Sequence, residues 1–174
     1  MKLGVNLGDN DDSIQRGSEG ENNFVKVAST KGYKVHKSSK TEDIHGHIDY
    51  WLENEKGDRK SVDVKGRKKG NRSDTKFSED WVWIEFKNVQ GKNGWVKGKA
   101  DFVAFEFENS FLLVKRAELR QLARELIKDR SKRARYGGEA KNVLYSRESR
   151  PDELTTQIRV ADIKNNLKTW EWCK

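Results

Sequence analysis

The chain of 174 residues is basic, with 36 Lys and Arg against 28 Asp and Glu and a formal net charge of +8 at pH 7. Its length suits one domain, and a hydrophobic fraction of 33% supports a modest folded core. No apolar run is long enough to span a bilayer and the polar N-terminus is unlike a secretory signal, so we expect a soluble, intracellular protein. The single cysteine excludes an internal disulfide and a cysteine zinc site, so a catalytic metal would be held by oxygen or imidazole.

The first half of the chain predicts a helix followed by a strand and a β-hairpin. Residues 1–16 look loosely ordered, and a single domain is expected over 17–174. Helical spacing of apolar residues over 17–31, ended by Gly32, predicts a short helix. Alternation predicts a strand over 33–37. A hairpin follows, with strands at 47–53 and 60–66 joined by a turn at 54–58.

The second half adds strands around one amphipathic helix. Leu119, Leu122, Ala123, Leu126 and Ile127 recur at helical spacing and predict this helix. A short final segment begins at Asp162, a candidate N-cap. Segments rich in aromatic and β-branched residues predict strands at 81–86, 100–108, 110–115, 142–146 and 156–160. We therefore expect an α+β fold with a central mixed sheet flanked by helices.

Basic residues are concentrated in three stretches, 65–76, 87–99 and 128–135. Clustered cations favour a polyphosphate partner, because neutralising phosphates releases condensed counterions. Trp95, within a Gly- and Lys-rich loop, is expected to be exposed for stacking on a base or sugar. By contrast, Arg116, Arg120, Arg124 and Lys128 are typical of a solvated helix face. The residues expected to contact nucleic acid are Arg67, Lys68, Lys69, Arg72, Lys92, Trp95, Lys97 and Lys99.

The predicted hairpin carries the residues best suited to chemistry. Asp63 and Lys65 lie two apart on one strand and therefore share a face, and a turn centred near Gly57 brings Asp49 alongside Asp63. Crowded carboxylates repel each other unless a cation lies between them, and Mg²⁺ is the usual hard cation for oxygen ligands. A cation held there can polarise a phosphodiester and activate water, while Lys65 orients that water or offsets developing charge.

Other interpretations of these residues remain open at this stage. Asp49 and Asp63 could form ordinary surface ion pairs, worth about 0–1 kcal/mol. Glu85 with Lys87 forms a second Glu-x-Lys pattern on the next strand, although choosing it leaves Lys65 without a role. His45 and His47 precede Asp49 and could bind zinc if that stretch is extended.

Asp49, followed after 13 residues by Asp63-Val64-Lys65, resembles the active-site signature of the PD-(D/E)xK nuclease superfamily. The stretch Arg16–Glu21 (RGSEGE), with Phe24, Ala28 and Gly32, resembles the opening helix of the Holliday-junction resolvase branch. Gly94-Trp95 with Ala100-Asp101-Phe102 is similar to phage-type nucleases. The signature's proline is Ile48 here, and its usual glutamate is Asp63; both replacements leave the chemistry intact.

The resemblance implies a restriction-endonuclease-like core and a Mg²⁺-dependent DNA endonuclease, with Mn²⁺ as a substitute. It implies that Asp49, Asp63, the Val64 carbonyl and Glu21 hold the metal, with Glu19 as second choice to Glu21, and that Lys65 positions the attacking water. It further implies branched DNA as substrate, a two-fold dimer, and the cytoplasm of a prokaryotic or phage-infected cell. The alternatives are a restriction-like or general phage nuclease, and a non-catalytic nucleic-acid-binding protein.

Overall fold

The computed structural model describes the backbone of residues 7–174 and the side chains from Ile14 onward. Its largest element is a six-stranded sheet in the order β1-β2-β3-β5-β6-β9. β3 and β5 are parallel and every other neighbouring pair is antiparallel, so the sheet is mixed. Its strands are β1 (Lys34–Lys37), β2 (Tyr50–Glu53), β3 (Arg59–Lys65), β5 (Phe102–Glu106), β6 (Ser110–Lys115) and β9 (Thr169–Cys173).

A second, three-stranded antiparallel sheet forms a separate layer, where the sequence predicted a single sheet. Its order is β4 (Trp81–Lys87), β8 (Arg150–Arg159) and β7 (Tyr145–Arg147). Val82, Ile84 and Phe86 bury one face of β4, while the alternate residues lie on its other face. This alternation predicts a strand correctly but does not say which sheet the strand joins, because the pairing with β8 is between distant segments.

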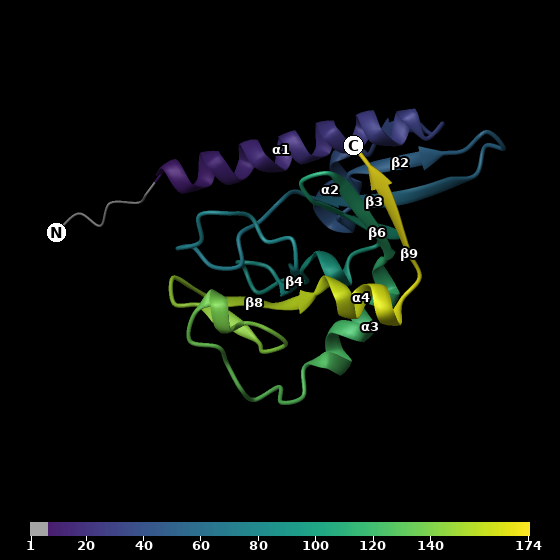
Figure 1. Cartoon of the computed structure of the whole chain (residues 1–174). Coiled ribbons are helices and arrows are strands. Elements are labelled where there is room, and N and C mark those ends of the chain that lie inside the picture. The colour runs from purple at the N-terminus through teal and green to yellow at the C-terminus, as the bar shows by residue number, and fades with distance from the viewer. Residues whose placement is uncertain (1–6) are drawn as a thin grey trace.

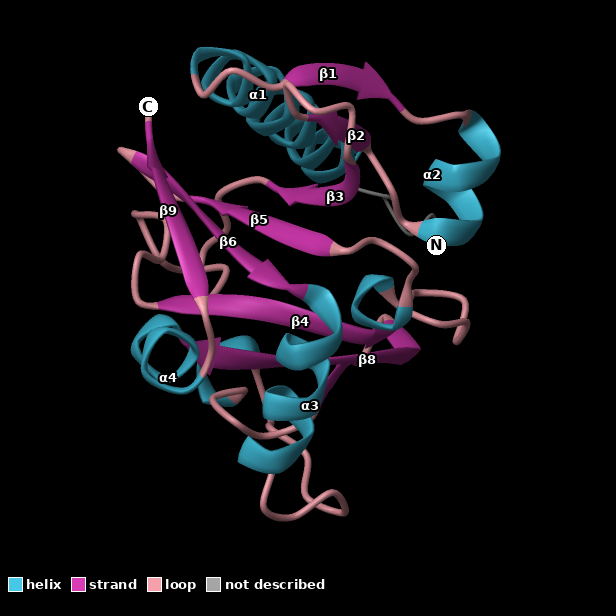
Figure 2. Ribbon diagram, turned by 90° about the vertical axis from the view of Figure 1, so that its right-hand side faces the viewer, coloured by secondary structure: helices cyan, strands magenta, loops and turns pink. Residues whose placement is uncertain are grey.

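One helix, α1, covers one face of the large sheet, and two others, α3 and α4, lie beside the small sheet (Figures 1 and 2). α1 (Leu7–Thr30) packs on β1, β2 and β3 over one core. A second core lies between the two sheets, α3 (Arg116–Leu126) and α4 (Val160–Asn166). The structure thus confirms an α+β fold with a mixed central sheet flanked by helices. The remaining helical elements are α2 (Lys40–Gly46), η1 (Trp95–Lys97) and η2 (Gly137–Glu139).

α1 is longer than predicted and begins at Leu7, so residues 7–16 are helical rather than loosely ordered; residues 1–6 lie outside the described part of the chain. No proline interrupts this polar stretch, and its one glycine, Gly8, costs a helix only about 1 kcal/mol. Gly20 also has a packing role. A Cβ there would lie 2.8 Å from Glu106 Oε2 and 3.0 Å from Gly66 Cα. A side chain at this position would therefore push α1 away from the end of β3.

Three local features differ from expectation. α2 was not predicted, although Ser39 and Glu42 form the capping box that begins it. α4 begins after Arg159 rather than at Asp162. The final segment forms β9, whose Trp170 and Trp172 pack against the core beneath α1.

Within residues 7–174, no helix combines the length and apolar character needed to cross a membrane.

Candidate active site

The β2–β3 hairpin brings Asp49 and Asp63 together, as the sequence predicted. Tyr50 pairs with Val62, and the Asp49 amide donates to the Val62 carbonyl at 2.9 Å, so Asp49 lies opposite Asp63. Val62 and Val64 point into the core beneath α1. Because side chains alternate along a strand, Asp63 and Lys65 point to the opposite face.

Both carboxylates are almost fully buried, with 8% of Asp49 and 2% of Asp63 exposed. Asp49 Oδ2 accepts a hydrogen bond from the Val64 amide at 2.6 Å. Asp63 Oδ1 lies 2.7 Å from Lys65 Nζ. Asp63 Oδ2 is buried and has no donor within the described part of the chain. A buried carboxylate oxygen without a partner is costly, and a proton or a cation between the acids would satisfy it.

The electrostatics of the pair favour such a proton or cation. Burial raises the pKa of Asp63 to about 7, with the charge of Asp49 adding to the rise and Lys65 opposing it. Burial also raises the pKa of Asp49, while Lys65 and the Val64 amide oppose this. The two carboxyls are close enough for a hydrogen bond between their side chains. Near neutral pH the pair therefore holds a proton readily, and a divalent cation could replace that proton.

Lys65 remains a cation in this site. Burial lowers its pKa, but the charges of Asp63 and Asp49 outweigh this effect and the net change is a rise. Its ammonium also lies 5.1 Å from the centre of the Trp95 ring, where a cation–π interaction adds support. A permanently charged amine suits the orientation of a water molecule or the neutralisation of an oxyanion, rather than proton abstraction.

Glu21 lies near the acidic pair but is engaged elsewhere. Its Oε2 accepts hydrogen bonds from Lys37 Nζ at 2.8 Å and from the Tyr50 hydroxyl at 3.1 Å. Its charge still contributes to the raised pKa of Asp49. Among the residues with described side chains, no three acidic, histidine or cysteine side chains converge closely enough to hold a metal ion. The structure therefore brings together two of the expected acids, with Glu21 beside them and paired to a lysine.

The face of β4 that carries Glu85 lies on the other side of the site. Glu85 Oε1 accepts from the Trp95 amide at 3.4 Å, and its charge helps raise the pKa of Lys65. The sequence analysis treats Glu85 only as part of a rival Glu-x-Lys motif. Nothing in the local pattern around Glu85 shows that the second sheet turns this face of β4 toward Lys65. Alternation with Trp81 and Trp83 was the only available signal.

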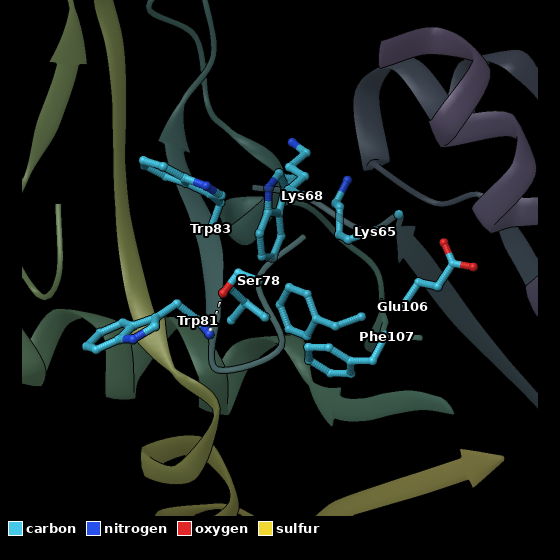
Figure 3. A pocket seen from close by; sticks show the side chains of 11 residues that line it. Lys65, Lys68, Ser78, Trp81, Trp83, Glu106 and Phe107 are labelled. Carbon is cyan, nitrogen blue, oxygen red and sulfur yellow. Dashed lines mark hydrogen bonds between the residues drawn. The ribbon is translucent and has the colours of Figure 1, made fainter. Parts of the chain in front are cut away.

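A small cavity of about 30 Å³ opens beside Lys65 between the two sheets. In Figure 3 the ammonium ends of Lys65 and Lys68 point the same way, away from the Phe107 ring, while Glu106 turns aside. Although much of Lys68 is exposed, loss of hydration around its ammonium lowers its pKa, and the positive charge of Lys65 adds to this. The two lysine side chains place positive charge beside the cavity, where it could attract an anion.

The loop that follows β3 is less free than its composition suggested. Arg67 Nη2 lies 2.9 Å from Glu79 Oε1, and its guanidinium stacks over the Phe77 ring at 4.8 Å. The Lys69 carbonyl accepts from the Trp83 indole at 2.9 Å. Lys68 and Arg72 are exposed and Lys69 is half-buried. Of this predicted phosphate-binding group, Arg67 is therefore already neutralised by a carboxylate.

Trp95 is not exposed for stacking, which corrects the expectation from its Gly- and Lys-rich surroundings. Only 5% of it is exposed, and its ring meets Phe105 edge-on at 5.9 Å. A tryptophan buries more apolar surface than any neighbour in this loop, so the loop folds around it. Of the nearby lysines, Lys92 and Lys99 are exposed and Lys97 is half-buried.

The structure contradicts the extended backbone on which a zinc site at His45 and His47 would depend. His47 adopts a left-handed conformation with φ of 51° at the end of α2, so the stretch from His45 to Asp49 is not extended. The side chains of His45 and His47 are consequently not held on one face of a strand.

Comparison of the chain with protein-family models, with curated proteins and with solved structures found no match. The functional interpretation below therefore depends on the residues and geometry of this chain.

Proposed function

We propose that this protein is a Mg²⁺-dependent DNA endonuclease with a restriction-endonuclease-like core. The observation that carries the proposal is the buried arrangement of Asp49, Asp63 and Lys65, with one oxygen of Asp63 lacking any described donor. Support also comes from the architecture, in which α1 is followed by an antiparallel β1-β2-β3 unit and β3, the strand of Asp63 and Lys65, pairs in parallel with β5.

Asp49 and Asp63 would hold the cation, which supplies polarisation of the phosphodiester and a more acidic water. The Val64 carbonyl and Glu21 are further ligands implied by the family resemblance. Glu21 could join only after releasing Lys37, with which it is now paired. Lys65 keeps its positive charge and stays on the sheet face of Asp63. It therefore orients the water by hydrogen bonding and offsets negative charge at the phosphate oxygens.

Two finer features belong to the same proposal. Branched DNA is the first substrate to test, because residues 16–21 resemble the opening helix of junction resolvases. A two-fold dimer would let two such sites cut opposed strands. A restriction-like or general phage nuclease would use the same residues.

The direct test is a cleavage panel of linear duplex, flap, single-stranded and four-way DNA with Mg²⁺, Mn²⁺ or EDTA. The wild-type protein should cut at least one substrate only with a divalent ion. Asp63→Asn should abolish cutting while DNA affinity stays the same or rises, because a charge that repels phosphate has been removed. Asp58→Asn, an exposed turn position, serves as the control and should cut normally.

A non-catalytic nucleic-acid binder is the second candidate. The absence of a third converging ligand among the described side chains favours it. If the wild-type protein binds DNA but cuts no substrate in the panel, this second function replaces the first.

A further inference from the structure

A group of four basic side chains lies on η1, on the end of β4 and on α3. These are Lys87, Lys97, Arg120 and Arg124, and we call them the α3 basic patch. α3 and β4 both contact η1, which places the four residues on adjoining elements. Figure 2 shows α3 beside β4 in the lower half of the molecule. The sequence alone predicts that the arginines of α3 form an ordinary solvated helix face.

The α3 basic patch has no acidic partner among the side chains that the structure describes. Several other cations of this protein are paired with a carboxylate, among them Arg67 with Glu79 and Arg147 with Glu153. By contrast, none of the four patch residues lies within 4.0 Å of a carboxylate in the described part of the chain. Arg120 Nε is in addition buried and has no hydrogen-bond acceptor among the described residues. The patch therefore presents unsatisfied positive charge rather than a mixed, solubilising surface.

The four charges are also close enough to repel one another. Burial lowers the pKa of Lys97, and Arg120, Lys87 and Arg124 lower it further. Like charges held together destabilise the folded chain unless an anion lies over them. Such an anion must carry several charges, because the cations come from three separate elements. A phosphate backbone meets this requirement.

Arg116 connects the patch to the acidic pair. Its guanidinium donates to the Ala100 carbonyl at 2.8 Å and to the Val96 carbonyl at 2.9 Å, which fixes the start of α3 against η1. The Arg116 charge interacts with both Arg120 and Asp63. η1 itself begins at Trp95, the residue beneath the Lys65 ammonium. Arg116 and η1 therefore link the patch to the residues around Asp63 and Lys65.

The geometry points to the α3 basic patch as the surface that binds the phosphate backbone of duplex DNA beside the Asp49–Asp63 site. This inference rests on the proposed function, because it supplies the substrate surface of that same site. A duplex fits better than a single strand. Single-strand binding depends on exposed aromatic rings that stack on bases, and Trp95, the aromatic residue of η1, is buried.

The test measures binding of a fluorescent DNA duplex by anisotropy over a range of salt concentrations, in Ca²⁺. The variant combines Lys87→Gln, Lys97→Gln and Arg124→Gln, and it leaves in place the half-buried Arg120, whose Nε is buried. The matched control combines Lys31→Gln, Lys56→Gln and Lys60→Gln, three exposed lysines in the turn after α1 and on the hairpin.

The slope of log affinity against log salt should fall by about 2.7 in the patch variant, at about 0.9 per lost phosphate contact, and stay near the wild-type value in the control. The single variant Arg124→Gln should lose about 0.9, and Arg124→Lys should restore it. These exposed single changes keep the test valid if the triple variant is unstable. An unchanged slope in both triple variants, or an equal loss in both, would overturn the inference. Tighter binding of a single strand than of the duplex would also overturn it.

Failure of this inference differs from failure of the proposed nuclease function. If wild-type protein cuts DNA and the patch variant binds and cuts as well as wild type, the DNA-binding role of the α3 basic patch is wrong and the nuclease function is supported. If wild-type protein never cuts but the patch variant loses its salt-dependent binding, the patch stands and the chain is a DNA-binding protein.

Discussion

Asp63→Asn should make the folded protein more stable at high pH, although it removes the central acid of the site. Asp63 is 2% exposed, and its pKa is raised from an ordinary 3.8 to about 7, chiefly by burial. The folded chain therefore binds a proton more tightly than the unfolded chain does. Stability is lost as the pH rises from about 4 to 7, and the loss is complete above pH 7.

The magnitude follows from the size of this pKa change. Each tenfold change in proton affinity corresponds to about 1.4 kcal/mol, so burial of the charged Asp63 costs roughly 4 kcal/mol above pH 7. The amide variant avoids this cost but also loses the contact of 2.7 Å with Lys65. Lys65 keeps the attraction of Asp49. We therefore expect a net gain of about 1–4 kcal/mol at pH 8 and almost none at pH 4.

The assay is urea unfolding of both proteins at several pH values between 4 and 8, in EDTA. Addition of Mg²⁺ at pH 8 should then raise the stability of the wild-type protein and leave Asp63→Asn unchanged, because only the wild type can bind the cation between two carboxylates. A stability difference that is the same at pH 4 and pH 8, or a variant less stable than wild type at pH 8, would refute the reasoning.

Three further predictions concern other parts of the site. Lys65→Ala should lower the cleavage rate by about 10²-fold or more while duplex affinity, measured by anisotropy, changes little; a normal rate would remove Lys65 from the mechanism. Gly20→Ala should destabilise the fold by about 1–3 kcal/mol in urea unfolding, because its methyl group would lie 2.8 Å from a buried carboxylate oxygen. Gly17→Ala, which meets nothing within 4 Å, is the control and should be neutral or stabilising, and equal effects would contradict this packing. Arg67→Gln should leave the salt dependence of DNA binding unchanged because Glu79 already neutralises Arg67; a slope lowered by about 0.9 would show that the pair opens on DNA.

The site residues closest in sequence could be predicted because their geometry is local. Alternation puts Asp63 and Lys65 on one face, and a turn of fixed length sets the register that places Asp49 opposite Asp63. Hydrophobic spacing likewise located α3, and β6 matched its expected range of 110–115. These features depend on contacts between residues that are neighbours or joined by one short turn.

The features that were missed depend on contacts between distant segments. Burial of Trp95 comes from Phe105, and the neutralisation of Arg67 comes from Glu79 across a loop. Glu85 reaches Lys65 only because β4 joins a second sheet with β8. Periodicity describes which faces of a strand are apolar, but it does not describe which layer covers each face.

Calorimetric titration of Mg²⁺ into the protein at pH 8 tests most directly whether the two hairpin acids share a divalent ion. We predict saturable binding by the wild-type chain and none by Asp63→Asn. Near pH 7 the binding heat should also vary with the ionisation enthalpy of the buffer, because the cation displaces the proton held by the pair. Equal Mg²⁺ binding by both proteins, or none by the wild type, would contradict the account.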